Sequence, residues 1–158
     1  MAGTQLTQEQ RMLIEWQCAQ LVHRFAMLND NNDYEALAAC FTEDGIMARP
    51  TMPDQPMHGR QTILEQFRKR PIRTIRHMMA NVHVQAESAE RATGRVYMIL
   101  YAGPPAAEGD AGPPLTDQAP MIGQFKDVFA KVGDDWLFAE RRGSLGLTLS
   151  GKGLALPT

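Results

Sequence analysis

Residues 24–45 read RFAMLNDNNDYEALAACFTEDG, and this stretch decides the fold. It predicts the end of one helix, a tight polar corner, a second short helix and an exit toward a strand. Asp30 ends the first helix, and steps of four back along that helix reach Ala26 and Val22, so the carboxylate continues a small, apolar face. Burying a charge costs free energy unless the charge has a partner. Asp30 is therefore either a structural cap for the corner or the working group of a cavity.

Helices are expected on both sides of this corner. Thr7 and Gln10 have the spacing of a capping box, so the first helix is expected to run from there to Asp30. Asp33 is placed to cap the second helix. Four segments are then expected before residue 72: the second helix at about 34–41, a short strand at 45–48, an irregular segment with three prolines at 49–59, and a third helix from Gly59 that Pro71 stops.

After residue 71 the pattern changes to that of strands. Four are expected, at 72–85, 92–101, 118–132 and 136–147. The segment 102–120 is rich in proline, glycine and alanine, so it is predicted to be a long mobile loop, either a lid or a tolerated insertion. Helices followed by antiparallel strands indicate an α+β domain whose helices cover one face of a curved sheet. The 158 residues are expected to form one domain, with a C-terminal tail at 148–158.

The strand within TGRVYMILY, residues 93–101, is apolar on both faces. Val96, Met98 and Leu100 point one way, and Tyr97, Ile99 and Tyr101 point the other way. One face is expected to meet the helices or a cavity. The other is expected to be covered by a second copy, in a homodimer or homotrimer formed through the sheet face, although a thicker core is the alternative.

The bulk composition excludes several classes of partner. The net charge is −2 and there is no basic run, so neither nucleic acid nor an anionic membrane is expected to bind. No apolar run approaches the ~20 residues of a membrane span, and the first ten residues lack the apolar core of a signal peptide. Cys18 and Cys40 fall among apolar neighbours on predicted helices. They are interpreted as reduced core residues of a cytoplasmic protein.

His77 is the histidine best placed for chemistry. It lies in TIRHMMANVHV, where it shares one strand face with Met79, Asn81 and His83 if no bulge intervenes. A histidine on an apolar face near a helix-end carboxylate has the ingredients of acid–base catalysis. A lone strand histidine is more often a satisfied core or edge residue, and the residues alone leave both readings open. None of the four histidines has metal-ligand spacing with another histidine or a cysteine, so no metal site is expected.

Four segments in order resemble the SnoaL-like branch of the nuclear transport factor two superfamily, the group that includes scytalone dehydratase. They are RFAMLNDNNDYEALAACFTEDG, GRQTILEQF, RHMMANVHV and GQFKDVFAKVGDDWLFAERR, and the resemblance covers about residues 8–147. It implies a cystatin-like cone, in which a strongly curved antiparallel sheet wraps around N-terminal helices. An apolar pocket is expected at the open end of the cone.

The resemblance also bears on the site. In scytalone dehydratase an aspartate at the end of the first helix orients a histidine on the long strand, and Asp30 and His77 fall at those positions. The chain departs from that enzyme at two places. It offers Tyr101 or its neighbours where the dehydratase has a second histidine, and Asn29 where the dehydratase has a tyrosine. These departures leave the substrate and the reaction open.

The leading hypothesis is a cofactor-independent lyase, most simply a dehydratase, that acts on a small, largely apolar cyclic or aromatic hydroxy compound. Asp30, His77 and Tyr101 are expected to be catalytic, and Asn81 is expected to help Tyr101 donate hydrogen bonds to a developing oxyanion. The pocket walls are expected to include the aromatic residues Phe25, Tyr34, Phe125 and Phe129. No cofactor and no metal are expected.

Three alternatives remain. An isomerase with Asp30 as the base is a close variant of the lyase. The same fold serves as the non-catalytic small subunit of ring-hydroxylating dioxygenases, and it also suits a ligand-binding protein without turnover. What separates the enzyme from the two non-catalytic roles is whether Asp30 and His77 form a hydrogen bond inside an open cavity.

Overall fold

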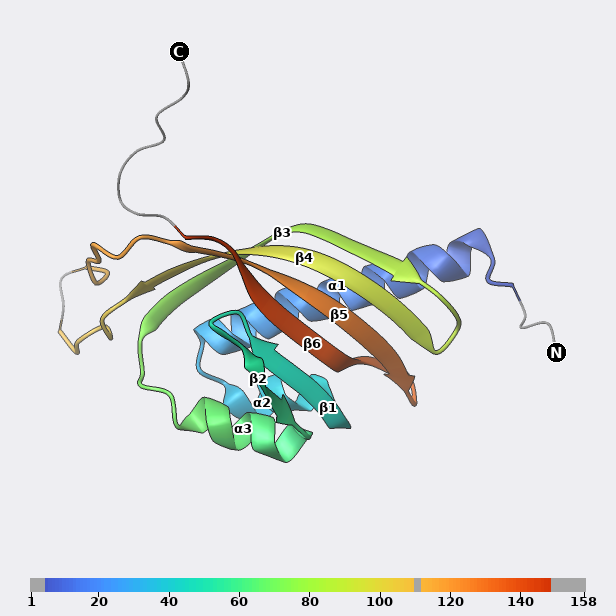
Figure 1. The fold of residues 1–158 in the computed structure, drawn as a ribbon, viewed down its shortest axis with the longest axis horizontal. Coiled ribbons are helices and arrows are strands. Elements are labelled where there is room, and N and C mark those ends of the chain that lie inside the picture. Colours follow the sequence, from blue (N-terminus) through green and yellow to red (C-terminus); the bar gives the residue numbers. More distant parts are fainter. Residues whose placement is uncertain (1–4, 110–111, 149–158) are drawn as a thin grey trace, which may run out of the picture.

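The computed structural model describes residues 5–109 and 112–148, so the predicted tail at 148–158 lies outside the described residues apart from its first position. Three helices and six strands follow one another along the described chain (Figure 1). They are α1 (Gln8–Asp30), α2 (Tyr34–Ala39), β1 (Phe41–Arg49), β2 (Met52–His58), α3 (Arg60–Arg68), β3 (Thr74–Ala86), β4 (Arg91–Gly103), β5 (Met121–Val132) and β6 (Asp135–Thr148).

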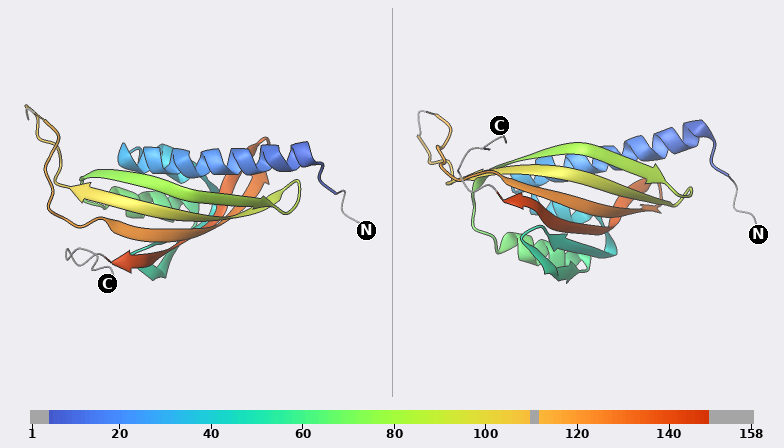
Figure 2. Two further views of the ribbon diagram at one scale, coloured as in Figure 1. Left: turned by 90° about the horizontal axis from the view of Figure 1, so that it is seen from above. Right: turned by 45° about the horizontal axis from the view of Figure 1, so that its top comes forward.

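The strands form one sheet in the order β2-β1-β6-β5-β4-β3. Every neighbouring pair is antiparallel except β1 and β6, which run parallel. The long strands β3 to β6 curve together, and α1 lies along one face of them (Figure 2). The helices α2 and α3 lie beside β1 and β2 at the other side of the molecule (Figure 1). The α+β fold predicted from the sequence, a curved, mostly antiparallel sheet around N-terminal helices, is confirmed.

The caps that set the helix starts are those the sequence predicts. The Thr7 hydroxyl accepts from the Gln10 backbone N–H at 3.1 Å, and the Gln10 side chain accepts from the Thr7 backbone N–H at 2.9 Å. Asp33 Oδ1 accepts from the Ala36 backbone N–H at 3.1 Å. Between the two helices Asn32 has φ 57°, a left-handed conformation that asparagine tolerates better than most residues. The Asn32 conformation and the Asp33 cap define the corner that follows α1, and therefore where Asp30 lies.

The segment 49–59, predicted to be irregular, is instead a hairpin. Its residues 52–58 form β2, which pairs with β1 and lies at the edge of the sheet. Proline lacks a backbone N–H, but an edge strand has one unpaired side, so Pro53 and Pro56 are tolerated there. The prediction was wrong because a proline count does not distinguish an edge strand from a loop. By contrast, 104–120 has no helix or strand among its described residues, although β4 extends two residues into the predicted loop 102–120 and β5 begins at Met121, not at 118.

A bulge in β3 decides which residues face inward. The register between β3 and β4 shifts between Ala80 and His83, and Asn81 has φ 50°. Before the bulge the odd-numbered residues His77 and Met79 face the helices, and after it the even-numbered residues do. Asn81 and His83 are consequently exposed. The predicted shared face of His77, Met79, Asn81 and His83 is corrected on this point.

The centre of the core is aromatic and encloses one charged pair. Phe25 of α1 meets Phe138 edge-on at 5.8 Å between ring centroids. Arg141 on β6 is fully buried, and its guanidinium lies 4.1 to 4.7 Å from the centroids of Phe25, Phe125 and Phe138. It donates to Asp127 Oδ2 at 3.1 Å.

The two buried charges stabilise each other against a large desolvation cost. Burial raises the pKa of the Asp127 carboxyl to about 6, although the Arg141 charge acts in the opposite direction. Burial likewise lowers the pKa of the Arg141 guanidinium, against the opposing charge of Asp127. Both shifts disfavour the charged forms, so desolvation outweighs the attraction, and removing one partner would leave the other buried and uncompensated.

Among the described residues, no helix is both long enough and apolar enough to span a membrane. Cys18 and Cys40 are buried and unpaired, as expected for reduced core residues. Burial raises the pKa of the Cys18 thiol to about 12, so this thiol stays protonated and packs as a small apolar group.

Arg141→Met tests the buried pair. The variant leaves Asp127 buried without a cation, so the free energy of unfolding in urea is expected to fall by about 3–5 kcal/mol. The double variant Arg141→Met/Asp127→Leu removes both charges and is expected to recover most of that loss. A double variant as unstable as the single one would show that the apolar contacts of the Arg141 stem, not its charge, stabilise the core.

Gly143→Ala tests how the β1–β2 turn is held against β6. A Cβ at Gly143 would lie 2.6–2.7 Å from atoms of Pro50, which is inside van der Waals contact. The substitution is expected to lower the free energy of unfolding by about 1–3 kcal/mol, the usual cost of overpacking. Gly146→Ala on the same strand is the control, because its added Cβ meets nothing closer than 3.7 Å. Equal losses of stability in the two variants would contradict the prediction.

Candidate active site

One pocket, with a volume of about 280 Å³, opens at the end of α1 where the corner, α3 and the strands converge. Its apolar wall includes Phe25, Tyr34, Met47, Phe67, Met98 and Phe125. Its polar wall includes Asn29, Asn32, Arg49, Arg70, Arg73 and His77. The volume suits a small ring compound, since drug-sized ligands occupy roughly 300–1,000 Å³.

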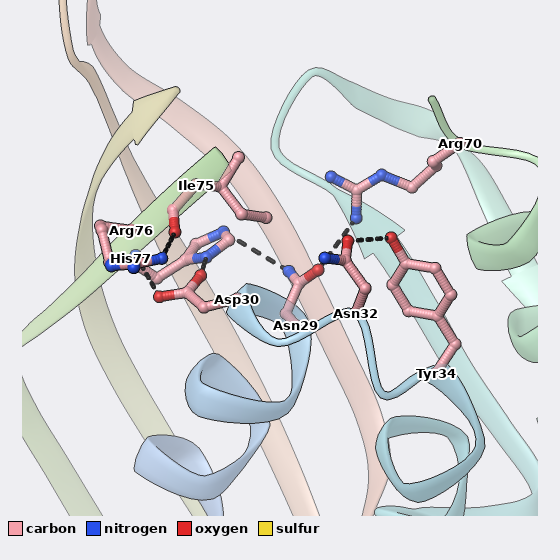
Figure 3. Close-up of polar contacts among 8 residues, drawn as sticks. All are labelled: Asn29, Asp30, Asn32, Tyr34, Arg70, Ile75, Arg76 and His77. Carbon is pink, nitrogen blue, oxygen red and sulfur yellow. Dashed lines mark hydrogen bonds and ion pairs between the residues drawn. The ribbon is translucent and has the colours of Figure 1, made fainter. Parts of the chain in front are cut away.

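Asp30 and His77 form a close, nearly buried pair at this pocket (Figure 3). Asp30 Oδ1 lies 2.5 Å from His77 Nδ1, and Asp30 Oδ2 accepts from the His77 backbone N–H at 2.9 Å. Their side chains are 8% and 7% exposed, respectively. The carboxylate accepts from Nδ1–H, so a neutral imidazole carries its proton on Nδ1 and leaves the Nε2 lone pair free. His77 lines the pocket, and Asp30 lies behind it.

Asn29 connects His77 to an arginine. Its Nδ2 lies 3.5 Å from His77 Nε2, and its Oδ1 accepts from Arg70 Nη1 at 3.1 Å (Figure 3). The contact of 3.5 Å is at the limit of a hydrogen bond, so it holds the Nε2 lone pair only weakly. A molecule bound in the pocket can therefore compete for Nε2, and the Asn29 amide can turn its N–H toward that molecule.

Tyr34 and Asn32 complete the wall beside Arg70. The Tyr34 hydroxyl donates to Asn32 Oδ1 at 2.8 Å, and the Tyr34 ring packs on Phe67 with 5.7 Å between centroids. Because the polar corner between α1 and α2 positions both residues, the same turn that ends α1 also builds one wall of the pocket. The phenol oxygen keeps its lone pairs for a second interaction.

The pocket is electropositive. Three arginines line it, and no carboxylate belongs to its lining. Burial lowers the pKa of the Arg70 guanidinium; Tyr34 acts in the opposite direction, and the charges of Arg49 and Arg73 lower that pKa further. The like charges therefore raise the electrostatic potential at Arg70, and an anion bound there would lower it.

Five of the predicted site residues lie at or directly behind the pocket wall. Phe25, Tyr34, Phe125 and His77 line it, and Asp30 holds His77 from behind. Phe129, which was expected in the wall, is fully buried in the core and packs on Phe138 with 5.2 Å between centroids. It faces the same side of β5 as Phe125 but lies four residues farther along the strand, beyond the pocket lining.

Tyr101 and Asn81 lie outside the pocket, and their expected placement is corrected. Tyr101 is 42% exposed on the outer face of β4, because strand side chains alternate and its neighbour Leu100 takes the inward position. Asn81 is exposed at the β3 bulge. Neither side chain is placed to donate to a group bound at His77.

The sequence analysis missed the polar residues of the wall. Asn29 was noted only as a departure from scytalone dehydratase, and Arg49, Arg70 and Arg73 were not considered. A signal was present, since residues 68–76 read RKRPIRTIR and hold five basic residues directly before His77. The statement that the chain has no basic run is corrected here, although the run is short and two of its arginines serve the pocket.

A metal centre finds no support in the described part of the chain. No group of three or more histidine, cysteine, aspartate or glutamate residues is arranged there to hold an ion. At the pocket itself both oxygens of Asp30 accept hydrogen bonds from His77, and Asp30 is not part of the pocket lining.

Comparison with solved structures identifies the same fold in other proteins. One is a candidate scytalone dehydratase from Novosphingobium aromaticivorans, with 19% identity, a TM-score of 0.74, and coverage of 94% of this chain and 95% of that chain. Another is a type 2 hexachlorocyclohexane dehydrochlorinase, with 14% identity, a TM-score of 0.72, and coverage of 96% and 99%. A protein of unknown function from Nostoc punctiforme, described as having a cystatin-like fold, has 20% identity, a TM-score of 0.70, and coverage of 93% and 98%. No curated protein matches the chain with significance.

These identities establish the fold alone, which is the predicted cystatin-like fold. The family follows from a different comparison, because the profile of the SnoaL-like domain matches residues 10–142, most of the chain. The resemblance inferred from the sequence segments is therefore confirmed. The chain belongs to the SnoaL-like domain family.

Proposed function

We propose that this protein is a lyase of the dehydratase type that acts on a small cyclic or aromatic hydroxy compound. The observation that carries the proposal is the Asp30–His77 pair, joined at 2.5 Å, nearly buried, and placed at the wall of an open pocket. A histidine whose tautomer is fixed by a carboxylate and whose other nitrogen faces a pocket is arranged as a general base.

The elimination requires one proton to move twice. His77 Nε2 removes a proton from a carbon beside an electron-withdrawing group, and the C–H electron pair forms the new C=C bond. The C–O bond to the hydroxyl group breaks, and the imidazolium returns the proton so that water leaves. Asp30 stabilises the imidazolium between the two transfers. No cofactor takes part in the step as written.

Donors in the pocket wall can stabilise the negative charge that develops on the substrate. Asn29 Nδ2 lies beside His77 Nε2, and the Arg70 guanidinium lies on the other side of the Asn29 amide. The apolar wall around them lowers the local dielectric constant, which strengthens both interactions. In this proposal Asn29 and Arg70 take the role that the sequence analysis gave to Tyr101 and Asn81.

The related structures support elimination as the class of reaction. Two of them are described as a scytalone dehydratase candidate and a dehydrochlorinase. Both names denote elimination across a carbon–carbon bond, of water in one case and of hydrogen chloride in the other. At 19% and 14% identity, these two structures favour elimination as the class of reaction but give no information about the substrate.

The competing functions fit the geometry less well. A non-catalytic dioxygenase subunit needs neither an open pocket nor a buried histidine, and this chain has both. An isomerase with Asp30 as the base would need a free carboxylate oxygen at the pocket, yet both oxygens are engaged with His77. A binding protein without turnover has the same pocket and is separated from a lyase only by an assay.

The catalytic test uses substitutions at the pair. With a panel of small cyclic hydroxy ketones, the wild-type protein is expected to form the conjugated product, followed by ultraviolet absorbance. His77→Gln is expected to lower kcat by about 10²–10⁴-fold, the usual contribution of an acid–base group, and Asp30→Asn is expected to lower it within the same range. His58→Gln is the matched control, because this exposed histidine lies on β2 outside the pocket lining.

A second readout separates loss of chemistry from loss of structure. Nitrogen-15 NMR of the imidazole rings is expected to show the Nδ1–H tautomer for neutral His77 in the wild type and a loss of that preference in Asp30→Asn. His58 is expected to give the same spectrum in both proteins. An Nε2–H tautomer in the wild type, or full activity in His77→Gln, would exclude His77 as the base.

We also propose that the protein forms a homodimer or homotrimer through the outer face of its sheet. This face carries exposed apolar side chains, among them Met78, Tyr97 and Tyr101. Sedimentation velocity is expected to show a dimer or trimer for the wild type and a monomer for Tyr97→Glu, which places a charge in the middle of the face. A monomeric wild type at micromolar concentration would contradict the proposal.

A further inference from the structure

Three arginines line the pocket, and none has a carboxylate partner within residues 5–109 and 112–148. Arg70 is half-buried, and its only hydrogen bond to a described residue runs to the neutral amide oxygen of Asn29, at 3.1 Å. Arg49 donates to the Met52 sulfur at 3.2 Å, a weak acceptor. Arg73 is exposed, so water solvates its charge without a protein partner.

Five arginines outside the pocket pair with carboxylates, whereas half-buried Arg11 donates to the Ala86 backbone carbonyl at 2.7 Å. The pairs are Arg60–Glu43, Arg68–Glu35, Arg91–Glu87, Arg141–Asp127 and Arg142–Glu140. Exposed arginines such as Arg95 need no partner, because water solvates them. Arg70 is only half-exposed and pairs with no carboxylate among the described residues, while Asp30 is engaged with His77.

The Arg70 guanidinium is therefore a partly desolvated cation with no carboxylate partner among the described residues. Burial lowers its pKa, and the neighbouring cations Arg49 and Arg73 contribute in the same direction, with Tyr34 opposing them. A desolvated cation among like charges is stabilised by an anion within hydrogen-bond reach. Since no described residue of the pocket lining is a carboxylate, a bound molecule could provide that anion.

We propose that the substrate carries a carboxylate, which Arg70 binds with support from Arg73 and Arg49. This inference rests on the proposed function and narrows its substrate to a small cyclic or aromatic hydroxy acid. The planar guanidinium group suits a carboxylate because two parallel N–H···O bonds can form. The sequence analysis expected a largely apolar substrate, and the arginines add a charged end to it.

The positions of the pocket groups set where the reacting carbon lies. The Asn29 amide separates the two functional groups, with Arg70 Nη1 3.1 Å from Oδ1 and His77 Nε2 3.5 Å from Nδ2 (Figure 3). A carboxylate at Arg70 therefore places the ring it is attached to alongside Asn29 and toward His77. The ring itself would lie against Phe25, Met98 and Phe125 in the apolar wall.

The test compares ligands of one shape and different charge. Isothermal titration calorimetry at pH 7 measures the dissociation constants of 4-hydroxybenzoate and 4-hydroxybenzamide. The wild type is expected to bind the carboxylate at least about tenfold more tightly, a difference of about 1.4 kcal/mol. Arg70→Gln is expected to remove that preference. Arg95→Gln is the control, because it removes the same charge from the exposed face of β4 and is expected to keep the preference.

Two outcomes would overturn the proposal. One is equal affinity of the wild type for the two compounds, or no binding of the carboxylate at millimolar concentration. The other is a preference that survives in Arg70→Gln.

The His77→Gln variant separates this inference from the proposed function. If the inference is right, this variant is expected to retain the carboxylate preference whether or not the wild type catalyses an elimination. If the lyase proposal is right and the carboxylate inference is wrong, elimination is expected from uncharged hydroxy ketones, while the wild type binds 4-hydroxybenzoate and 4-hydroxybenzamide with equal affinity.

Discussion

The bond between Asp30 and His77 joins the last residue of α1 to the first part of β3, at the pocket wall. The carboxylate is nearly buried and sits at a helix C-terminus, where the partial negative charge of the backbone disfavours a second negative charge. The last turn of α1 carries no basic residue, so the compensation comes from β3. One oxygen accepts from the His77 ring and the other from the His77 backbone. The same two bonds therefore fix the helix against the sheet and orient the imidazole, so the proposed catalytic role depends on the contacts that also hold the fold together.

A second charged pair supports the pocket from within the core. The Arg141 guanidinium lies against the rings of Phe25 and Phe125, and both rings also line the pocket. Their positions therefore depend on an ion pair that the substrate does not need to touch. Such a pair is costly to desolvate and is a weak source of stability compared with apolar packing. Its effect here is geometric, since a guanidinium placed between aromatic rings sets the spacing between α1, β5 and β6.

Much of the fold and the central pair of the site could be predicted from the sequence, for identifiable reasons. Asp30 and His77 stand out locally, one as an acid that ends an apolar helical stripe and the other as a histidine on an apolar strand. Asn81 and Tyr101 were misplaced because the face of a strand residue depends on every residue before it, and one bulge reverses the alternation. The contact between Arg70 and Asn29 was not visible in the sequence because it joins residues 41 positions apart, one just after α3 and the other near the end of α1. Alternation and helical periodicity carry no information about such long-range contacts.

The proposed interactions at Arg70 and at His77 differ in whether the charge involved is present before the reaction starts. A carboxylate bound at Arg70 would carry its charge before, during and after the reaction, so that interaction stabilises the ground state and the transition state alike. The imidazolium at His77 exists only after a proton has moved, so its stabilisation by Asp30 favours the transition state. Interactions of the first kind set affinity, and interactions of the second kind set the rate. Under the carboxylate proposal, binding at Arg70 would mainly set affinity, and the Asp30–His77 pair would mainly set the rate, so the pair is the part that would have to be positioned accurately.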